Sequence, residues 1–211
     1  MQKKNPQRVN VYLDGDFAFG LSKLVAAWLK VGQELNEEKI NTLLSEDELE
    51  MAYQRALHFI HYRERSEAEI QRYLIKKEIS ESVIDLVLDK LRNAGLVNDQ
   101  RFAQMWVENR SEFHPRSPRM MAMELQQHGI PREQIDEALE DVNQEALAYQ
   151  VAVKQSSRYT RLEWQDFRTR LYGFLARRGF SYEIIVPIIK QVWEENMSND
   201  HQKITHEEVR S

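Results

Sequence analysis

The side chains best suited to chemistry in this sequence are pairs of cations. They occur at four places: Arg63/Arg65, Lys76/Lys77, Arg116/Arg119 and Arg177/Arg178. Guanidinium and ammonium groups bind carboxylates and phosphates, so these pairs could bind an acidic protein surface or a nucleic-acid backbone. Cations near helix ends also stabilise the helix dipole, and this structural role explains them equally well. We treat the eight residues as candidate partner-binding or nucleic-acid-binding residues.

Metal and catalytic chemistry have less support. His58 and His61 are three residues apart in a predicted helix, but no nearby carboxylate completes a recognisable ligand set. Acidic pairs such as Glu67/Glu69 are typical of solvated helix faces, because no apolar pocket pattern surrounds them. The sequence lacks a nucleophile elbow, a phosphate-binding glycine loop and a zincin motif. We expect no enzyme activity, no metal site and no cofactor.

The paired cations belong to a repeated helical unit. Leu74, Leu125 and Leu175 align at spacings of 51 and 50 residues. Each aligned segment has an amphipathic helix, a basic or potentially basic residue, a tight turn, an apolar residue and a second helix. A period near 50 residues predicts an array of helical modules rather than one compact bundle.

The turn in each repeat predicts one strained residue. Gly129 and Gly179 follow the middle helix of the second and third repeats, where a left-handed residue commonly ends a helix. Glu78 occupies the equivalent position in the first repeat. We therefore expect Glu78 to take the left-handed conformation at a cost of roughly 1 kcal/mol.

Capping signals predict where the helices begin and end. Ser66 and Glu69 form a capping box, Ser117 precedes a proline suited to the first helical position, and Gly95 follows a helix. Pro187 is expected to kink the final helix or delay its start. The predicted helices lie near residues 22–32, 36–44, 47–62, 66–77, 81–94, 98–107, 118–128, 131–141, 143–157, 164–175 and 182–195.

A strand pattern occurs at the N-terminus. Residues 8–13 alternate between apolar and polar side chains, Asp14-Gly15 is a two-residue turn signal, and residues 16–19 can return as a second strand. A two-stranded hairpin is marginal by itself, so it should pack on neighbouring structure. We expect Phe17 and Trp28 to anchor it.

These elements predict a mainly α protein, an elongated curved array of three tandem three-helix repeats with a small N-terminal β-hairpin and helix extension. The predicted divisions are the extension, the three repeats and a disordered tail, at residues 1–46, 47–95, 96–141, 142–195 and 196–211. The tail is expected to be disordered because residues 197–211 show no apolar period.

Composition restricts the class of protein. The 211 residues include seven glycines, five prolines and no cysteine. Few turn-forming residues disfavour an all-β fold, and the absence of cysteine excludes disulfides and suits a reducing compartment. Apolar runs are far shorter than the ~20 residues of a membrane span, and no signal-peptide pattern is present. We expect a cytoplasmic protein rather than a membrane protein.

The net charge of −5 is unevenly distributed. Residues 51–110 carry a net charge of +1, residues 111–157 carry −4, and residues 158–195 carry +2. An acidic chain is poorly suited to binding DNA by bulk electrostatics alone. The alternation of sign favours a surface matched to another protein or to a protein–nucleic acid assembly.

Four blocks within residues 52–195 resemble the RecX family of recombination regulators. In family order, they are Arg63–Glu69, Gly95–Ala103, Glu124–Ile130 and Arg177–Ser181. The sequence departs from the family pattern at Glu78 and Ser117, where glycine is usual, and at Asn98, where aspartate is common. These departures concern local turn geometry. The hairpin-bearing N-terminus resembles the extension found in some members.

The resemblance implies a curved array that binds along the groove of a RecA filament on single-stranded DNA. A member of this family is expected to inhibit recombinase, ATPase and SOS co-protease activities, and to reach single-stranded DNA mainly through the filament. We expect a monomer. The alternatives are a DNA-binding helical module that acts without a recombinase, and a general scaffold. No catalytic residues follow from the resemblance.

Overall fold

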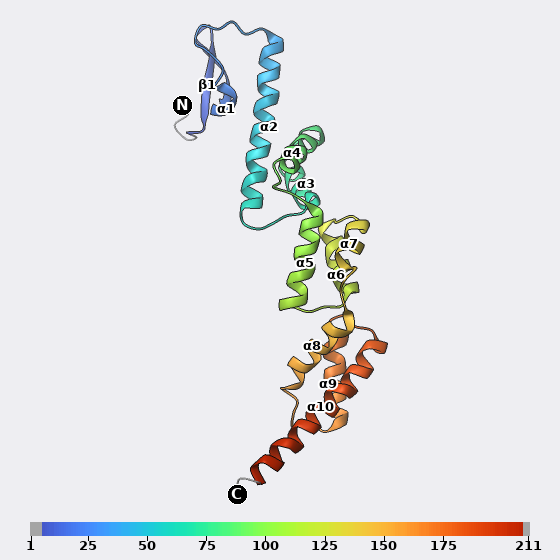
Figure 1. The fold of residues 1–211 in the computed structure, drawn as a ribbon. Coiled ribbons are helices and arrows are strands. Elements are labelled where there is room, and N and C mark those ends of the chain that lie inside the picture. Colours follow the sequence, from blue (N-terminus) through green and yellow to red (C-terminus); the bar gives the residue numbers. More distant parts are fainter. Residues whose placement is uncertain (1–5, 209–211) are drawn as a thin grey trace. The chain divides into compact units, whose positions relative to one another are not determined.

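A computed structural model describes residues 6–208, which form two strands and ten helices (Figure 1). The chain divides into two compact units, with the division after Asn98. The first unit contains β1 (Arg8–Leu13), β2 (Asp16–Ser22), α1 (Lys23–Ala26), α2 (Glu37–His61), α3 (Glu67–Ile75) and α4 (Glu81–Asn93). The second contains α5 (Asp99–Phe113), α6 (Pro118–His128), α7 (Arg132–Leu139), α8 (Gln144–Ser156), α9 (Trp164–Ala176) and α10 (Tyr182–Glu208).

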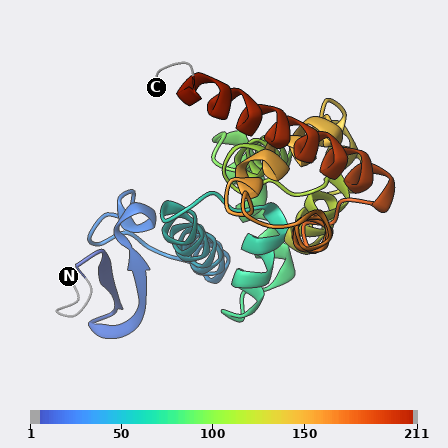
Figure 2. The same ribbon diagram turned by 90° about the horizontal axis from the view of Figure 1, so that it is seen from below.

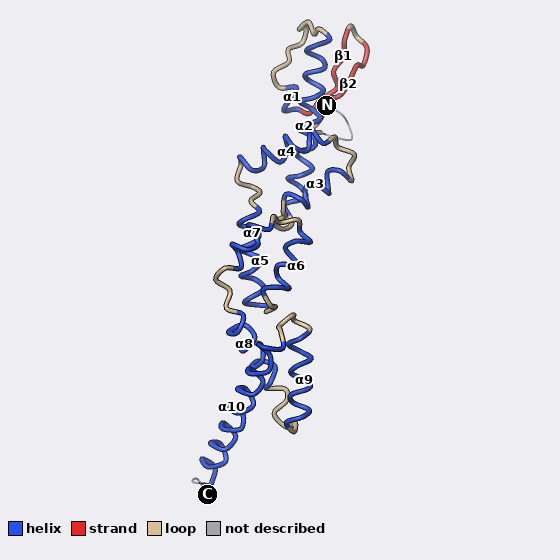
Figure 3. The backbone as a smooth tube through the Cα atoms, turned by 90° about the vertical axis from the view of Figure 1, so that its right-hand side faces the viewer, coloured by secondary structure: helices blue, strands red, loops and turns tan. Residues whose placement is uncertain are grey.

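The hairpin forms where the alternating pattern predicts it. β1 and β2 pair antiparallel, with an irregularity in the register between Val11 and Tyr12, and Figure 3 shows both strands at the N-terminal end of the chain. Asp14 and Gly15 have φ values of 52° and 95°. Positive φ at both central residues is the geometry of the two-residue turns that suit the twist of a hairpin.

The anchors of the hairpin differ from those predicted. Phe17 is 59% exposed and Trp28 is 88% exposed, so neither holds the hairpin in place. Leu21 is fully buried instead. The pairing explains the difference: Phe17 pairs with Tyr12 beside the turn, whereas Leu21 lies near the opposite end of the hairpin, which contacts α2. Figure 2 shows the hairpin beside that helix.

Helix α2 is continuous where two helices were predicted. It runs from Glu37 to His61, so the predicted boundary between residues 46 and 47 lies inside it. Asn36 caps its N-terminus through a 2.8 Å bond from the Lys39 N–H, as predicted. No glycine or proline interrupts these 25 residues, so nothing in the backbone ends the helix early. Helix α1 is shorter than predicted and ends at Ala26, although Ser22 caps it.

Each repeat has its own apolar core, which confirms the predicted array of three-helix units. Leu74, Leu125 and Leu175 are fully buried, one in each core. The first core lies between α2, α3 and α4, the second between α5, α6 and α7, and the third between α8, α9 and α10. The 50-residue period therefore corresponds to separate small cores.

The turn after the middle helix is the same in all three repeats. Glu78, Gly129 and Gly179 have φ values of 60°, 84° and 85°, which confirms the left-handed conformation predicted for Glu78. The N–H groups of the next residues, Ile79, Ile130 and Phe180, donate to the aligned leucine carbonyls at 3.3, 3.1 and 3.4 Å. This hydrogen-bond pattern is that of a Schellman turn, which satisfies carbonyls left open at a helix end.

Helix α10 begins at Tyr182, as predicted, and Pro187 lies inside it rather than delaying its start. The helix continues to Glu208, although a disordered tail is predicted from residue 196 onwards. Residues 196–208 contain neither glycine nor proline, so no helix-ending residue follows the packed part of α10. Residues 209–211 of the predicted tail lie outside the described residues. Within residues 6–208, no helix is long and apolar enough to cross a membrane.

Candidate partner-binding surface

In the first unit, the predicted arginine pair is engaged in local structure. Ser66 and Glu69 form the predicted capping box, each N–H donating to the other side chain at 3.2 Å. The Glu69 carboxylate also lies 2.5 Å from Arg63 and 3.4 Å from Arg65. Arg65 stacks on Phe59, with 4.1 Å between its guanidinium carbon and the ring centre. These contacts assign Arg63 and Arg65 a role in holding the start of α3.

The cations that follow the middle helices share a geometry in the first and third repeats. The Lys77 ammonium lies 5.7 Å from the Tyr73 ring centre, and the Arg178 guanidinium carbon lies 3.7 Å from that of Phe174. In each pair the cation follows the aromatic residue by four positions, and it lies over the ring just beyond the end of the helix. Lys76 and Arg177, which precede these cations, are exposed.

The second repeat has Glu124 at the position of these aromatic residues. Its carboxylate accepts hydrogen bonds from Trp106 Nε1 at 2.9 Å and from Arg110 Nε at 2.7 Å. Arg116 Nη1 lies 2.8 Å from the other carboxylate oxygen. Because the Glu124 side chain is only 13% exposed, these are charge-assisted contacts in a partly desolvated site. Glu124 therefore fixes the positions of two arginines, whereas Arg119 is exposed.

The second and third repeats meet where α6 begins. The Ser117 N–H donates to the Arg178 carbonyl at 2.9 Å, and the Ser117 hydroxyl caps α6 through the Met120 N–H at 3.3 Å. A Cβ on Gly179 would lie 2.2 Å from Met120 Cγ and 2.6 Å from Ser117 Oγ. Glycine is therefore needed at position 179 for two reasons: its φ is positive, and the side chains of Met120 and Ser117 lie too close for a Cβ.

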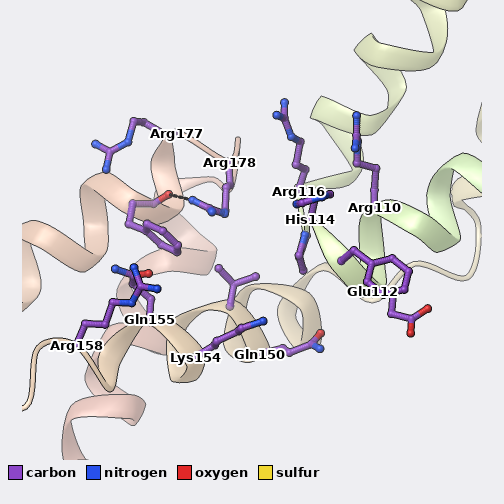
Figure 4. A pocket seen from close by; sticks show the side chains of 14 residues that line it. Arg110, Glu112, His114, Arg116, Gln150, Lys154, Gln155, Arg158, Arg177 and Arg178 are labelled. Atoms are coloured by element: carbon purple, nitrogen blue, oxygen red, sulfur yellow. Dashed lines mark hydrogen bonds between the residues drawn. The ribbon is translucent and has the colours of Figure 1, made fainter.

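A hollow of about 660 Å³ lies beside this junction, and basic residues from both repeats line it (Figure 4). Figure 4 shows Arg110, His114 and Arg116 on one side and Arg177 and Arg178 on another, with Lys154 on α8 and Arg158 just beyond the end of α8 below them. We call this feature the basic hollow. Its lining is completed by Glu112, Phe113, Pro115, Gln150, Val151, Gln155 and Phe174.

The electrostatics of the basic hollow are dominated by positive charge. Six lysines and arginines line it, against the one carboxylate of Glu112. Burial lowers the pKa of Arg178 from its ordinary value, and the nearby charges of Arg116 and Arg177 lower it further. Arg110 and Arg116 pair with Glu124. Among the side chains the structure describes, Lys154, Arg158 and Arg177 have no carboxylate within ion-pair distance.

The structure brings together part of the predicted set and adds residues that sequence reasoning missed. Arg116, Arg177 and Arg178 line one hollow, although the first is about sixty positions from the other two. Arg110, Lys154 and Arg158 were missed because they lie at the ends of α5 and α8, the first helices of their repeats, whereas the predicted pairs flank the middle helices. An available signal was that Lys154 and Arg158 lie close together in the sequence at one helix end, Lys154 in the last turn of α8 and Arg158 just after it.

His58 and His61, which the sequence does not favour as metal ligands, pack against an aromatic ring. The His58 ring is 5.3 Å from the Tyr62 ring in an edge-on arrangement, and the His61 ring is 5.7 Å from it. In the part of the chain that the structure describes, no group of three or more His, Cys, Asp or Glu side chains is placed to hold a metal ion.

Sequence profiles match most of the chain in four consecutive blocks. The Regulatory protein RecX N-terminal domain matches residues 1–36, and the first, second and third three-helix domains of RecX match residues 52–91, 98–139 and 143–189. These matches follow the hairpin extension and the three repeats in order.

Individual relatives and solved structures agree with these matches. The chain is 34% identical over 199 residues to the Regulatory protein RecX of Bacillus pumilus, covering 92% of this chain and 75% of the relative. It is also 34% identical over 202 residues to that of Bacillus subtilis, covering 92% and 76%. A crystal structure of regulatory protein RecX superposes with a TM-score of 0.69 at 29% identity, covering 90% of this chain and 95% of that one. The crystal structure of RecX from Lactobacillus salivarius has a TM-score of 0.61 at 25% identity, covering 70% and 97%.

Proposed function

Because the chain belongs to the RecX family of regulatory proteins, we propose that it binds the RecA filament on single-stranded DNA and inhibits it. In this proposal the chain acts in the cytoplasm and lowers recombinase, ATPase and SOS co-protease activities. It thereby modulates recombination, DNA repair and the SOS response. The chain acts by binding and carries out no catalysis of its own.

The basic hollow is the observation that supports a partner of this kind. The whole chain carries a net charge of −5, yet six cations gather around one hollow. A protein that relied on phosphate neutralisation over its whole surface would carry net positive charge. A local basic site on an acidic chain suits a partner that offers phosphates together with protein contacts. A filament provides both, and several weak contacts on tandem repeats can then act together.

The test replaces Arg177 and Arg178 with alanine and measures binding to two targets. One target is labelled single-stranded DNA alone, and the other is the same DNA coated with RecA and a non-hydrolysable nucleotide. We expect the unaltered chain to prefer the coated DNA and to lower the ATPase rate of RecA. The double variant should bind the filament about tenfold more weakly, as the loss of roughly 1.4 kcal/mol implies.

A matched control carries Arg132→Ala and Lys190→Ala. It removes the same charge from exposed residues of the same unit, whose partners are Asp136 and Glu194 outside the hollow. This control should keep filament affinity, and circular dichroism should show unchanged helical content in both variants. Equal affinity for bare and coated DNA, with an unchanged ATPase rate, would refute the filament proposal in favour of a DNA-binding module that acts without a recombinase.

A further inference from the structure

The basic hollow also has features that point to the class of ligand it takes. Its cations come from three places: the end of α5 with the following loop, the end of α8 with the turn after it, and the turn after α9. Lys154 lies in the last turn of α8, and Arg158 follows two residues after the end of that helix. Because the cations come from separate segments around the hollow, a ligand with several phosphates in a row could contact several of them at once.

The charges in the hollow are available to such a ligand. Lys154, Arg158 and Arg177 are exposed and have no carboxylate partner among the described side chains. Arg178 is held in place by stacking on Phe174 and by its 3.4 Å hydrogen bond to the Phe174 carbonyl, leaving its charge uncompensated. Arg110 and Arg116 are oriented by Glu124. The hollow thus combines fixed arginines with adjustable cations at its edge.

An exposed aromatic side chain lies among these cations. Phe113, the last residue of α5, lines the hollow and is 59% exposed. The amides of Gln150 and Gln155 also line it and can donate and accept hydrogen bonds. Proteins that bind single-stranded nucleic acid combine a basic groove for the backbone with aromatic side chains on which bases stack. A peptide of acidic residues alone would use the cations but has no planar base to stack on the phenyl ring.

We propose that the basic hollow binds a short stretch of single-stranded nucleic acid, with its phosphates on Lys154, Arg158, Arg177 and Arg178 and a base stacked on Phe113. The inference rests on the proposed function, because it names the surface through which the chain contacts the strand within the filament. Phosphate contacts give affinity without sequence preference, and stacking on Phe113 distinguishes a nucleic acid from other polyanions.

The experiment uses the full chain and a labelled oligothymidylate at low salt, without any recombinase. Lys154→Ala with Arg158→Ala should weaken binding at least tenfold and reduce the slope of log affinity against log salt by about 1.4, since each phosphate contact contributes about 0.7. Phe113→Ala should weaken binding at least about fivefold and leave that slope unchanged. Both variants alter exposed side chains, and the Arg132→Ala, Lys190→Ala chain serves as the control for charge.

A backbone of the same length without bases separates the two contributions. Phe113→Ala should not weaken binding of this abasic strand, whereas the Lys154 and Arg158 variant should weaken binding of both strands. If a poly-glutamate peptide of equal charge binds as tightly as the oligothymidylate, or if neither variant weakens binding of the oligothymidylate, the inference is wrong. Inhibition of the RecA ATPase is a separate measurement. If the chain inhibits RecA but its binding to single-stranded nucleic acid does not depend on the basic hollow, only this inference is wrong. If the hollow binds the strand but the chain does not inhibit RecA, only the proposed function is wrong.

Discussion

At the scale of single residues, the turn after each middle helix determines which side chains are tolerated. Glu78, Gly129 and Gly179 all have positive φ, and glycine reaches this region at little steric cost. Glu78 carries a side chain there, so the first repeat has a strained helix end that the other two lack. The same turn tolerates glutamate in the first repeat, whereas in the third repeat Met120 and Ser117 leave no room for a Cβ on Gly179.

The strain at Glu78 leads to a stability prediction. We expect Glu78→Gly to leave the free energy of unfolding unchanged or to raise it by up to ~1 kcal/mol, because relief of the left-handed strain offsets the greater unfolded-state entropy of glycine. Denaturant melts would measure the change. Gly129→Ala is the matched control and should lower stability by about 1 kcal/mol. A clear loss of stability in the Glu78→Gly chain would contradict the prediction. It would mean that a contact of the Glu78 side chain stabilises the fold by more than the left-handed conformation costs.

At the scale of elements, α2 links two parts of the first unit. Its N-terminal half holds the hairpin: Asp47, which is largely buried, lies 2.7 Å from the Arg8 guanidinium and accepts a 2.5 Å hydrogen bond from the Ser22 N–H. Its C-terminal half contributes Ala52 and Ala56 to the core of the first repeat. A single uninterrupted helix therefore belongs to both structures, which is why no break occurs at the predicted boundary.

The role of Asp47 can be tested by removing its carboxylate. Asp47→Ala should destabilise docking of the hairpin by about 2 kcal/mol, because the partly buried Arg8 loses its ion pair and the Ser22 N–H loses its acceptor. Hydrogen exchange of the β1 and β2 amides should become faster, while exchange in α3 and α4 should not change. Glu48→Ala, at the next and exposed position, is the control. Unchanged exchange in the hairpin would show that Leu21 alone holds it.

At the scale of the whole molecule, stability is distributed over separate cores. Each repeat buries its own apolar residues, and repeats of this kind gain stability from their own cores and from contacts with neighbouring repeats. The N-terminal hairpin contributes to none of the three cores. It is bound to the first unit through the buried Leu21 and the Asp47 contacts.

We therefore expect deletion of residues 1–45 to leave a cooperatively folded helical protein. The deletion removes the hairpin and the first turns of α2, but it keeps Ala52 and Ala56, and Asp47 becomes accessible to water instead of remaining as a buried unpaired charge. Circular dichroism and a thermal melt would measure the result. An unfolded truncated chain would mean that the hairpin is needed for the first repeat to fold, and the division of the chain proposed from its sequence would be wrong.

The sequence alone determined the features that depend on near neighbours. The Ser66 and Ser117 caps and the Asp14-Gly15 turn follow from residues within a few positions of one another. The 50-residue period is visible in the order of residues itself, and aligning the repeats by that period gives the left-handed Glu78. Local backbone sterics and helix periodicity govern such features, so the amino-acid order is enough to predict them.

Only the tertiary structure decided which predicted cations lie together. Arg63 and Arg65 turned out to hold the start of α3, while Arg116 and Arg178 came together with Lys154 and Arg158 around one hollow. That gathering depends on how the second and third repeats pack at Ser117 and Gly179, where contacting residues are about sixty positions apart. The tertiary structure also decided how the hairpin is anchored. Leu21 rather than Phe17 is buried, because the end of the hairpin away from the turn contacts α2. Helix periodicity gives the buried face of each helix, but it contains no information on which surfaces of separate repeats adjoin.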